Sequence, residues 1–119
     1  MSPIKFPMNS HDYYHAHVYF EKETLDLAAE LCKKSGDLFS VNVGQIHQKP
    51  VGPHPKWSCQ ISFSSHDFDP LITWLENNRR SLTVLIHAQT GNDFKDHTEY
   101  AYWLGDEVKL NLSMFDHSS

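Results

Sequence analysis

The period of the hydrophobic pattern changes repeatedly along the chain, and this alternation is what most restricts its fold. Residues 13–20 alternate apolar and polar side chains, as a half-buried strand does. From residue 25 the apolar residues recur at helical spacing, with Thr24 as the predicted cap and Gly36 as the predicted end. Strand patterns return at 39–47, where Gly44 allows a bulge, and at 57–63. Asp69 and Pro70 then predict the start of a second helix, and a fourth strand follows at 82–87.

The predicted order of strand, helix, strand, strand, helix, strand is that of a ferredoxin-like α+β fold. In this βαββαβ arrangement an antiparallel sheet carries both helices on one face. We expect the first and third strands to be central and parallel, with the fourth antiparallel beside the first. Residues 100–115 predict a C-terminal hairpin or an extra strand, although Asp96 and Glu99 could instead begin a short helix. We expect a single domain over residues 1–119 with an ordered core of about 12–112.

The composition argues against several classes of partner. The chain has 15 acidic and 10 basic residues and a formal charge of -5, so it should repel nucleic acid. No apolar run approaches the roughly 18 to 20 residues of a membrane helix, and residues 1–7 lack the apolar stretch of a secretion signal. We therefore expect a cytoplasmic protein. Cys32 and Cys59 both occupy core-facing positions and are predicted to be free buried thiols.

The most unusual compositional feature is the number of histidines, which is nine. In the expected topology His15 and His17 begin the first strand, His54 precedes the third, and His87 ends the fourth. These four side chains should meet at one end of the sheet. The next candidate is His97, with Glu99 as its nearest acidic neighbour. The others are assigned to solvent (His11, His66 and His117) or left undecided (His47).

The parity of the strands predicts which face of the sheet the histidines occupy. Ala16 and Val18 must face the helices, so His15 and His17 face away from them. Ser58, Gln60 and Ser62 share that polar face, but Tyr19 and Leu85 lie there too. Such a face is only partly protected, so we expect the C-terminal segment, a second subunit or both to cover it. A homodimer is the predicted assembly.

A cluster of imidazoles favours a metal site or a proton-transfer site. Imidazole is a common ligand of zinc, iron, copper and nickel, and two histidines at i and i+2 of a strand can reach one ion. The alternative is that each histidine is a hydrogen-bonded structural residue. The sequence contains no Gly-x-Ser-x-Gly elbow, glycine-rich phosphate loop or CxxC pair, which disfavours other common chemistries.

Several segments together resemble the DOPA 4,5-dioxygenase family. They are Tyr14–Phe20, Val51–Pro55, His87 with Thr90-Gly91, Asp96–Thr98, and Trp103–Gly105, which span nearly the whole chain. The resemblance implies a ferredoxin-like fold and extradiol ring cleavage of L-DOPA or a related catechol by a non-haem metal and O2. The chain departs from the family pattern after His87, where a proline is expected and this sequence has Ala88 and Gln89.

The resemblance also guides the expected roles. The metal should be Fe(II), with zinc or another divalent ion as a possible substitute, because cleavage with oxygen requires an ion that passes electrons. We expect His17, His54 and His87 as ligands and His15 as a fourth candidate. His97 or His15 should take a catechol proton and later return one. The residues expected to bind the substrate are Tyr19, Trp57, Ser58, Gln60 and Lys56.

Three other functions use the same residues. The first is a noncatalytic dimeric module that binds a metal or an aromatic ligand without turning it over. The second is a zinc-dependent hydrolase or lyase, which would need no oxygen. The third is a structural protein whose histidines only form hydrogen bonds.

Overall fold

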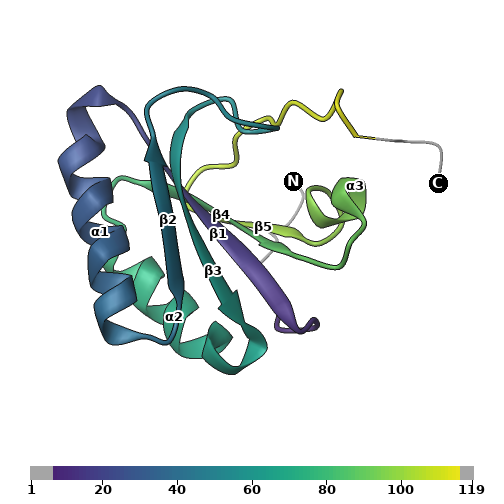
Figure 1. The fold of residues 1–119 in the computed structure, drawn as a ribbon, viewed down its shortest axis with the longest axis horizontal. Coiled ribbons are helices and arrows are strands. Elements are labelled where there is room, and N and C mark those ends of the chain that lie inside the picture. The colour runs from purple at the N-terminus through teal and green to yellow at the C-terminus, as the bar shows by residue number, and fades with distance from the viewer. Residues whose placement is uncertain (1–6, 116–119) are drawn as a thin grey trace.

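The alternating segments pair into one five-stranded antiparallel sheet in the order β2-β3-β1-β4-β5, in a ferredoxin-like α+β fold (Figure 1). This computed structural model describes residues 7–115. The strands are β1 (Tyr13–Phe20), β2 (Asn42–His47), β3 (Trp57–Ser64), β4 (Thr83–Ala88) and β5 (Ala101–Leu104). The helices are the 3₁₀ turn η1 (Lys22–Thr24), α1 (Leu25–Leu38), α2 (Ser65–Asn78) and α3 (Asp93–Asp96). Helices α1 and α2 lie on one side of the sheet, and α3 lies away from them at its other end (Figure 1).

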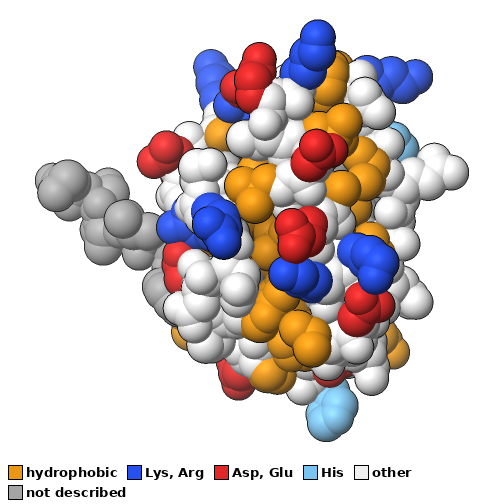
Figure 2. All heavy atoms as spheres, turned by 90° about the vertical axis from the view of Figure 1, so that its left-hand side faces the viewer, with side chains coloured by type: hydrophobic (Ala, Val, Ile, Leu, Met, Phe, Trp, Pro, Cys, Tyr) orange, Lys and Arg blue, Asp and Glu red, His pale blue; other side chains and the backbone are white. Residues whose placement is uncertain are grey.

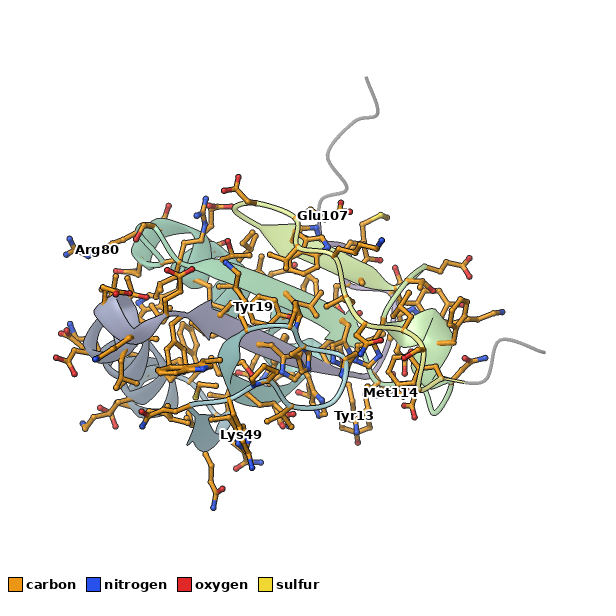
Figure 3. The ribbon with its side chains drawn as sticks, turned by 90° about the horizontal axis from the view of Figure 1, so that it is seen from above. Tyr13, Tyr19, Lys49, Arg80, Glu107 and Met114 are labelled. Atoms are coloured by element: carbon orange, nitrogen blue, oxygen red, sulfur yellow. The ribbon has the colours of Figure 1, made fainter. Side chains whose placement is uncertain are left out.

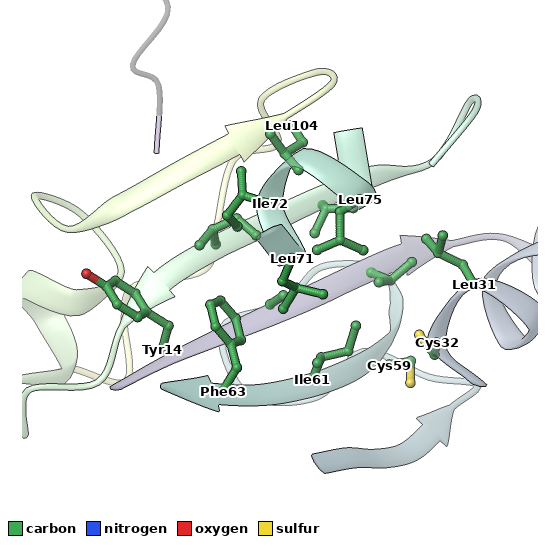
Figure 4. Close-up of a cluster of buried hydrophobic side chains, with 14 of the residues drawn as sticks. Tyr14, Leu31, Cys32, Cys59, Ile61, Phe63, Leu71, Ile72, Leu75 and Leu104 are labelled. Atoms are coloured by element: carbon green, nitrogen blue, oxygen red, sulfur yellow. The ribbon is translucent and has the colours of Figure 1, made fainter. Parts of the chain in front are cut away.

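The hydrophobic core lies between the sheet and the two long helices, where strand parity predicted it. Ala16 and Val18 of β1 are fully buried there, beside Ile61 of β3. Leu71 and Leu75 of α2 pack over the same sheet face (Figure 4). Because successive strand residues point to opposite faces, the side chains of His15, His17 and Tyr19 lie on the sheet face away from this core.

The two central strands are antiparallel, so the predicted parallel arrangement is wrong. Tyr13 pairs with Ser64, and Phe20 pairs with Trp57. The reason is the β2–β3 pairing, which is itself antiparallel and reverses the chain. The crossover through helix α1 makes β2 parallel to β1, and β3 lies between these two strands. The start of β1 therefore lies beside the end of β3, and not beside its start.

Two helix boundaries differ from the prediction. Helix α1 continues past Gly36 to Leu38, so the next strand begins at Asn42 instead of residue 39. A Cβ at Gly36 would lie 3.1 Å from Cγ2 of Val43, so glycine serves close packing of α1 on β2 here. Helix α2 begins at Ser65, because the Ser65 N–H donates to the carbonyl of Asp12 at 2.8 Å directly after β3. Pro70 consequently lies inside α2.

Three smaller expectations are confirmed. The β2–β3 register shifts between Val43 and Ile46, as a bulge at Gly44 requires. Cys32 and Cys59 are buried and form no disulfide. The C-terminal alternative of an extra strand is the correct one, because β5 pairs with β4.

The sheet face opposite α1 and α2 is covered by residues 105–115, called here the C-terminal strap. Val108 and Leu110 of the strap pack near Tyr19 and Leu85. The N–H of Asn111 donates to the carbonyl of Pro53 at 2.9 Å. The predicted cover by the C-terminal segment is thus confirmed.

The outer surface carries charges of both signs. Seen from the α1 side, acidic and basic side chains alternate around a band of hydrophobic ones (Figure 2). Within residues 7–115, no helix combines the length and the apolar character that crossing a bilayer requires.

Candidate active site

The site begins with two neighbouring strands that carry histidines on the same face. His15 of β1 pairs directly with His87 of β4, and His17 lies two residues further along β1. The ring centroids of His15 and His87 are 5.3 Å apart, and those of His17 and His87 are 5.0 Å apart. The predicted meeting of the start of β1 with the end of β4 is confirmed.

His54 reaches the same place from the proline-rich loop between β2 and β3. A turn in which the His54 N–H donates to the carbonyl of Val51 at 3.1 Å bends this loop. The His54 ring lies over that of His17, with centroids 3.9 Å apart. The predicted convergence of four histidines therefore occurs. Its route differs from the prediction, because the start of β3 lies beside the end of β1 and the loop must fold back.

The histidines surround a cavity of about 210 Å³. It lies between α3 and the sheet face opposite α1 and α2. Its lining residues are His15, His17, His54, Gln60, His87, Gln89, Asp93, Asp96 and His97.

Three of these imidazoles are arranged as ligands of one metal ion would be. The candidate ligand nitrogens of His15, His17 and His87 all lie within 4.8 Å of one another. The Nε2 atoms of His17 and His87 are 2.9 Å apart, and two nitrogens bound side by side to one ion at about 2.1 Å are separated by roughly 3 Å. His87 Nδ1 lies 2.8 Å from the carbonyl oxygen of Ala88. Its N–H donates there, which leaves the lone pair of Nε2 facing the cluster.

His54 has a different hydrogen-bonding partner. Its Nδ1 lies 2.7 Å from the hydroxyl of Tyr19, a side chain that is only 2 % exposed. Burial raises the pKa of the Tyr19 hydroxyl well above its usual value, so the hydroxyl keeps its proton. In the tautomer in which the hydroxyl donates, Nδ1 of His54 is the acceptor. In that tautomer the proton of a neutral His54 is on Nε2, so this nitrogen can donate a hydrogen bond but cannot coordinate a metal ion. Figure 3 shows Tyr19 in the middle of the molecule.

His97 is held over the cavity by α3 and the preceding turn. The buried carboxylate of Asp96 accepts from the N–H of Thr90 at 2.9 Å and from its hydroxyl at 2.7 Å. The side chain of Asn92 caps the helix by accepting from the N–H of Lys95 at 3.1 Å. His97 Nδ1 donates to the carbonyl of Asp93 at 2.8 Å, so its Nε2 is left as an acceptor.

Burial keeps the clustered imidazoles neutral. Loss of hydration lowers the pKa of His54 to about 4 and that of His87 to about 3, and the neighbouring histidines add to both shifts. The pKa of His17 is also lowered well below its usual value, mainly by burial. Burial lowers the pKa of His15 as well, although the carboxylate of Asp96 acts in the opposite direction. Neutral imidazole is the form that binds metals.

The residues predicted to bind substrate separate into two groups. Gln60 lines the cavity, and Ser58 lies on the same sheet face beside Tyr19. Trp57 packs instead against the core on the helix side, edge-on to Phe20 at 6.1 Å. Lys56 lines a different cavity and lies 3.5 Å from the carboxylate of Glu21.

The remaining histidines lie outside the cavity. His66 is exposed on α2 and His47 is half-buried at the end of β2. His11, expected in solvent, is half-buried because its ring packs on Tyr100 at 4.4 Å. His117 lies outside the described residues.

Three cavity residues were missed by the sequence reasoning: Gln89, Asp93 and Asp96. Glu99 was named as the acidic neighbour, yet Asp96 has that position. Asn92 is the feature of the sequence that could have indicated them, because asparagine is a preferred helix cap and predicts a helix beginning at Asp93. That helix places Asp93 and His97 one turn apart.

The fold and the cavity define a class of protein: a ferredoxin-like α+β domain with a histidine cluster suited to a metal ion. The chain belongs to the Dopa 4,5-dioxygenase family, whose model matches residues 14–114. It is similar to DOPA 4,5-dioxygenase of Amanita muscaria, with 29% identity over 84% of this chain and 48% of that protein. It is also 29% identical to an uncharacterized 21.2 kDa protein of Botryotinia fuckeliana, over 85% of this chain and 62% of that protein. The chain thus spans about half to three fifths of these curated relatives.

A solved structure supports the same assignment. The crystal structure of a "putative dioxygenase" from Nostoc punctiforme superposes with a TM-score of 0.83. The two sequences are 40% identical, and the match covers 86% of this chain and 89% of that one.

Proposed function

We propose that the protein is an extradiol dioxygenase that opens the ring of L-DOPA or a related catechol with Fe(II) and O2. The observation that carries the proposal is the pair of Nε2 atoms of His17 and His87 at 2.9 Å, with His15 close to both. Family membership and the similarity to a DOPA 4,5-dioxygenase support the type of reaction.

His15, His17 and His87 are the proposed metal ligands. His15 replaces His54 in the sequence-based set. The candidate ligand nitrogens of His15 lie within 4.8 Å of those of His17 and His87, whereas Nδ1 of His54 is hydrogen-bonded with the Tyr19 hydroxyl. When bound, Fe(II) would hold the catechol and O2 together and pass electrons between them, a redox role that zinc cannot fill.

The other cavity residues would move protons. His97 presents Nε2 as an acceptor that can take a proton from a catechol hydroxyl. His54 presents Nε2–H as a hydrogen-bond donor that can stabilise charge on an oxygen as the ring opens, and His97 can return to that oxygen the proton it took from the catechol. Asp96 and Tyr19 position these two imidazoles without touching the substrate.

The test is anaerobic reconstitution with Fe(II), followed by addition of L-DOPA or a simple catechol in aerated buffer. One O2 should be consumed per catechol, and a yellow ring-opened product should form. Zinc loading is the control and should give no oxygen uptake. Activity with zinc but without oxygen would instead identify a hydrolase or lyase, and tight catechol binding without uptake would identify a binding module.

Tyr19→Phe should lower kcat by roughly tenfold to a hundredfold while leaving metal content unchanged. The variant removes only the hydroxyl that fixes the His54 tautomer, so KM should change little. The pH profile of the activity should also shift, because His54 loses its hydrogen-bond partner. Tyr13→Phe is the matched control, since Tyr13 is 62% exposed on the same strand. Loss of metal in Tyr19→Phe would instead make His54 a ligand.

A further inference from the structure

The walls of the histidine cavity carry negative charge without a compensating lysine or arginine among the described residues. Apart from its imidazoles, the ionisable residues lining it are Asp93 and Asp96. No lysine or arginine is among its lining residues within 7–115. Lys56, which the sequence suggested as an anion partner, lines another cavity and pairs with Glu21.

The two carboxylates are not equivalent. Asp96 is buried, and both of its oxygens accept hydrogen bonds from Thr90, so its charge is internally satisfied. Asp93 is exposed on α3 and forms no ion pair with any residue of the described chain. Its carboxylate is therefore available to a ligand that extends out of the cavity.

We propose that the preferred substrate is a catechol whose side chain ends in an ammonium group and carries no carboxylate, with Asp93 as its partner. This inference rests on the proposed function and specifies its substrate class. It departs from L-DOPA, whose side chain carries a carboxylate beside its ammonium group.

The physical reason is the cost of an unpaired charge. A carboxylate directed at α3 would lie beside Asp93, and one directed at the sheet would meet the neutral amides of Gln60 or Gln89. Neither wall supplies a counter-charge for the hydration that the carboxylate loses. An ammonium group would gain Asp93 as a partner. Since Asp93 is exposed, the gain in affinity should be modest, at roughly threefold to tenfold over a neutral chain.

Three catechols of similar size test the proposal: 3,4-dihydroxyphenylethylamine, 4-propylcatechol and 3-(3,4-dihydroxyphenyl)propionate. Their binding to the metal-free and Fe(II)-loaded chain is measured without oxygen by quenching of tryptophan fluorescence at pH 8, where an ordinary imidazole is neutral. Turnover is measured separately by oxygen uptake. Affinity should fall in the order amine, neutral, acid.

Asp93→Asn should bring the amine-to-acid affinity ratio down by roughly threefold to tenfold. Asp69→Asn is the matched control, because it makes the same change in charge at an exposed position on α2, behind the sheet. The ratio in this control should stay at its wild-type value.

The outcomes separate the two proposals. If oxygen is consumed but the acid binds with an affinity equal to or higher than that of the amine, the proposed substrate class is overturned and the dioxygenase proposal stays intact. The predicted order of binding without oxygen uptake supports the substrate class and rejects the dioxygenase. If none of the three catechols binds, or if Asp93→Asn leaves the ratio unchanged, the proposed role of Asp93 is rejected.

Discussion

His17→Ala is expected to abolish both stable metal binding and ring cleavage. His17 Nε2 is 2.9 Å from His87 Nε2, and the variant removes one of the three nitrogens of the proposed ligand set. Metal affinity should fall by more than roughly a hundredfold, since even residues that only support a ligand are worth about 10–100-fold. Metal content after dialysis and oxygen uptake measure the two losses, and circular dichroism checks that the variant is folded.

Two further variants make this prediction specific. His66→Ala removes an exposed histidine of α2 and should change neither quantity. His54→Ala should keep its metal but lose most of its turnover, because His54 is proposed to donate a hydrogen bond to the reacting oxygen. If His54→Ala loses its metal while His15→Ala keeps it, the ligand set is His17, His54 and His87 after all.

Strand parity explains how much of this site is predictable from sequence. Ala16 and Val18 must be buried, so their neighbours His15 and His17 must face the other way, whatever the strand order. The same rule places Trp57 with Cys59 and Ile61 on the core face. Trp57 was nevertheless expected to bind substrate, as an aromatic side chain near the site that could hold a planar ring.

Parity carries no information about strand direction, and this is where prediction failed. Direction is decided by the β2–β3 hairpin and the α1 crossover, which together make β1 and β3 antiparallel. His54 reaches the cluster only because its loop folds back onto the strap at Pro53 and Asn111. The positions of Asp93 and Asp96 depend on a four-residue helix, too short to leave a periodic pattern.

The metal-free protein should lose stability steeply as the pH falls from about 6.5 toward 4. His54 and His87 have an ordinary pKa of 6.5 when unfolded, but burial lowers their pKa values in the folded protein to about 4 and about 3. Between these limits the unfolded chain binds protons that the folded chain does not. Protonation therefore favours unfolding as the pH falls, and the full stability is present only above about 6.5.

The expected size of this loss is several kcal/mol, at about 1.4 kcal/mol for each pKa unit. That is comparable with the whole stability of an ordinary domain, about 5–15 kcal/mol, so acid unfolding should set in well above the folded-state pKa values. Urea unfolding of the metal-free chain at a series of pH values measures the slope. His87→Gln should flatten it, whereas His66→Gln should not, because His66 is exposed. An unchanged slope in His87→Gln would mean that His87 is not held neutral by the fold.

A metal ion at these nitrogens competes with the same protons. Fe(II) should therefore stabilise the chain near pH 7 and lose that effect in acid. The plot of unfolding free energy against pH should then be steeper for the loaded protein than for the metal-free one.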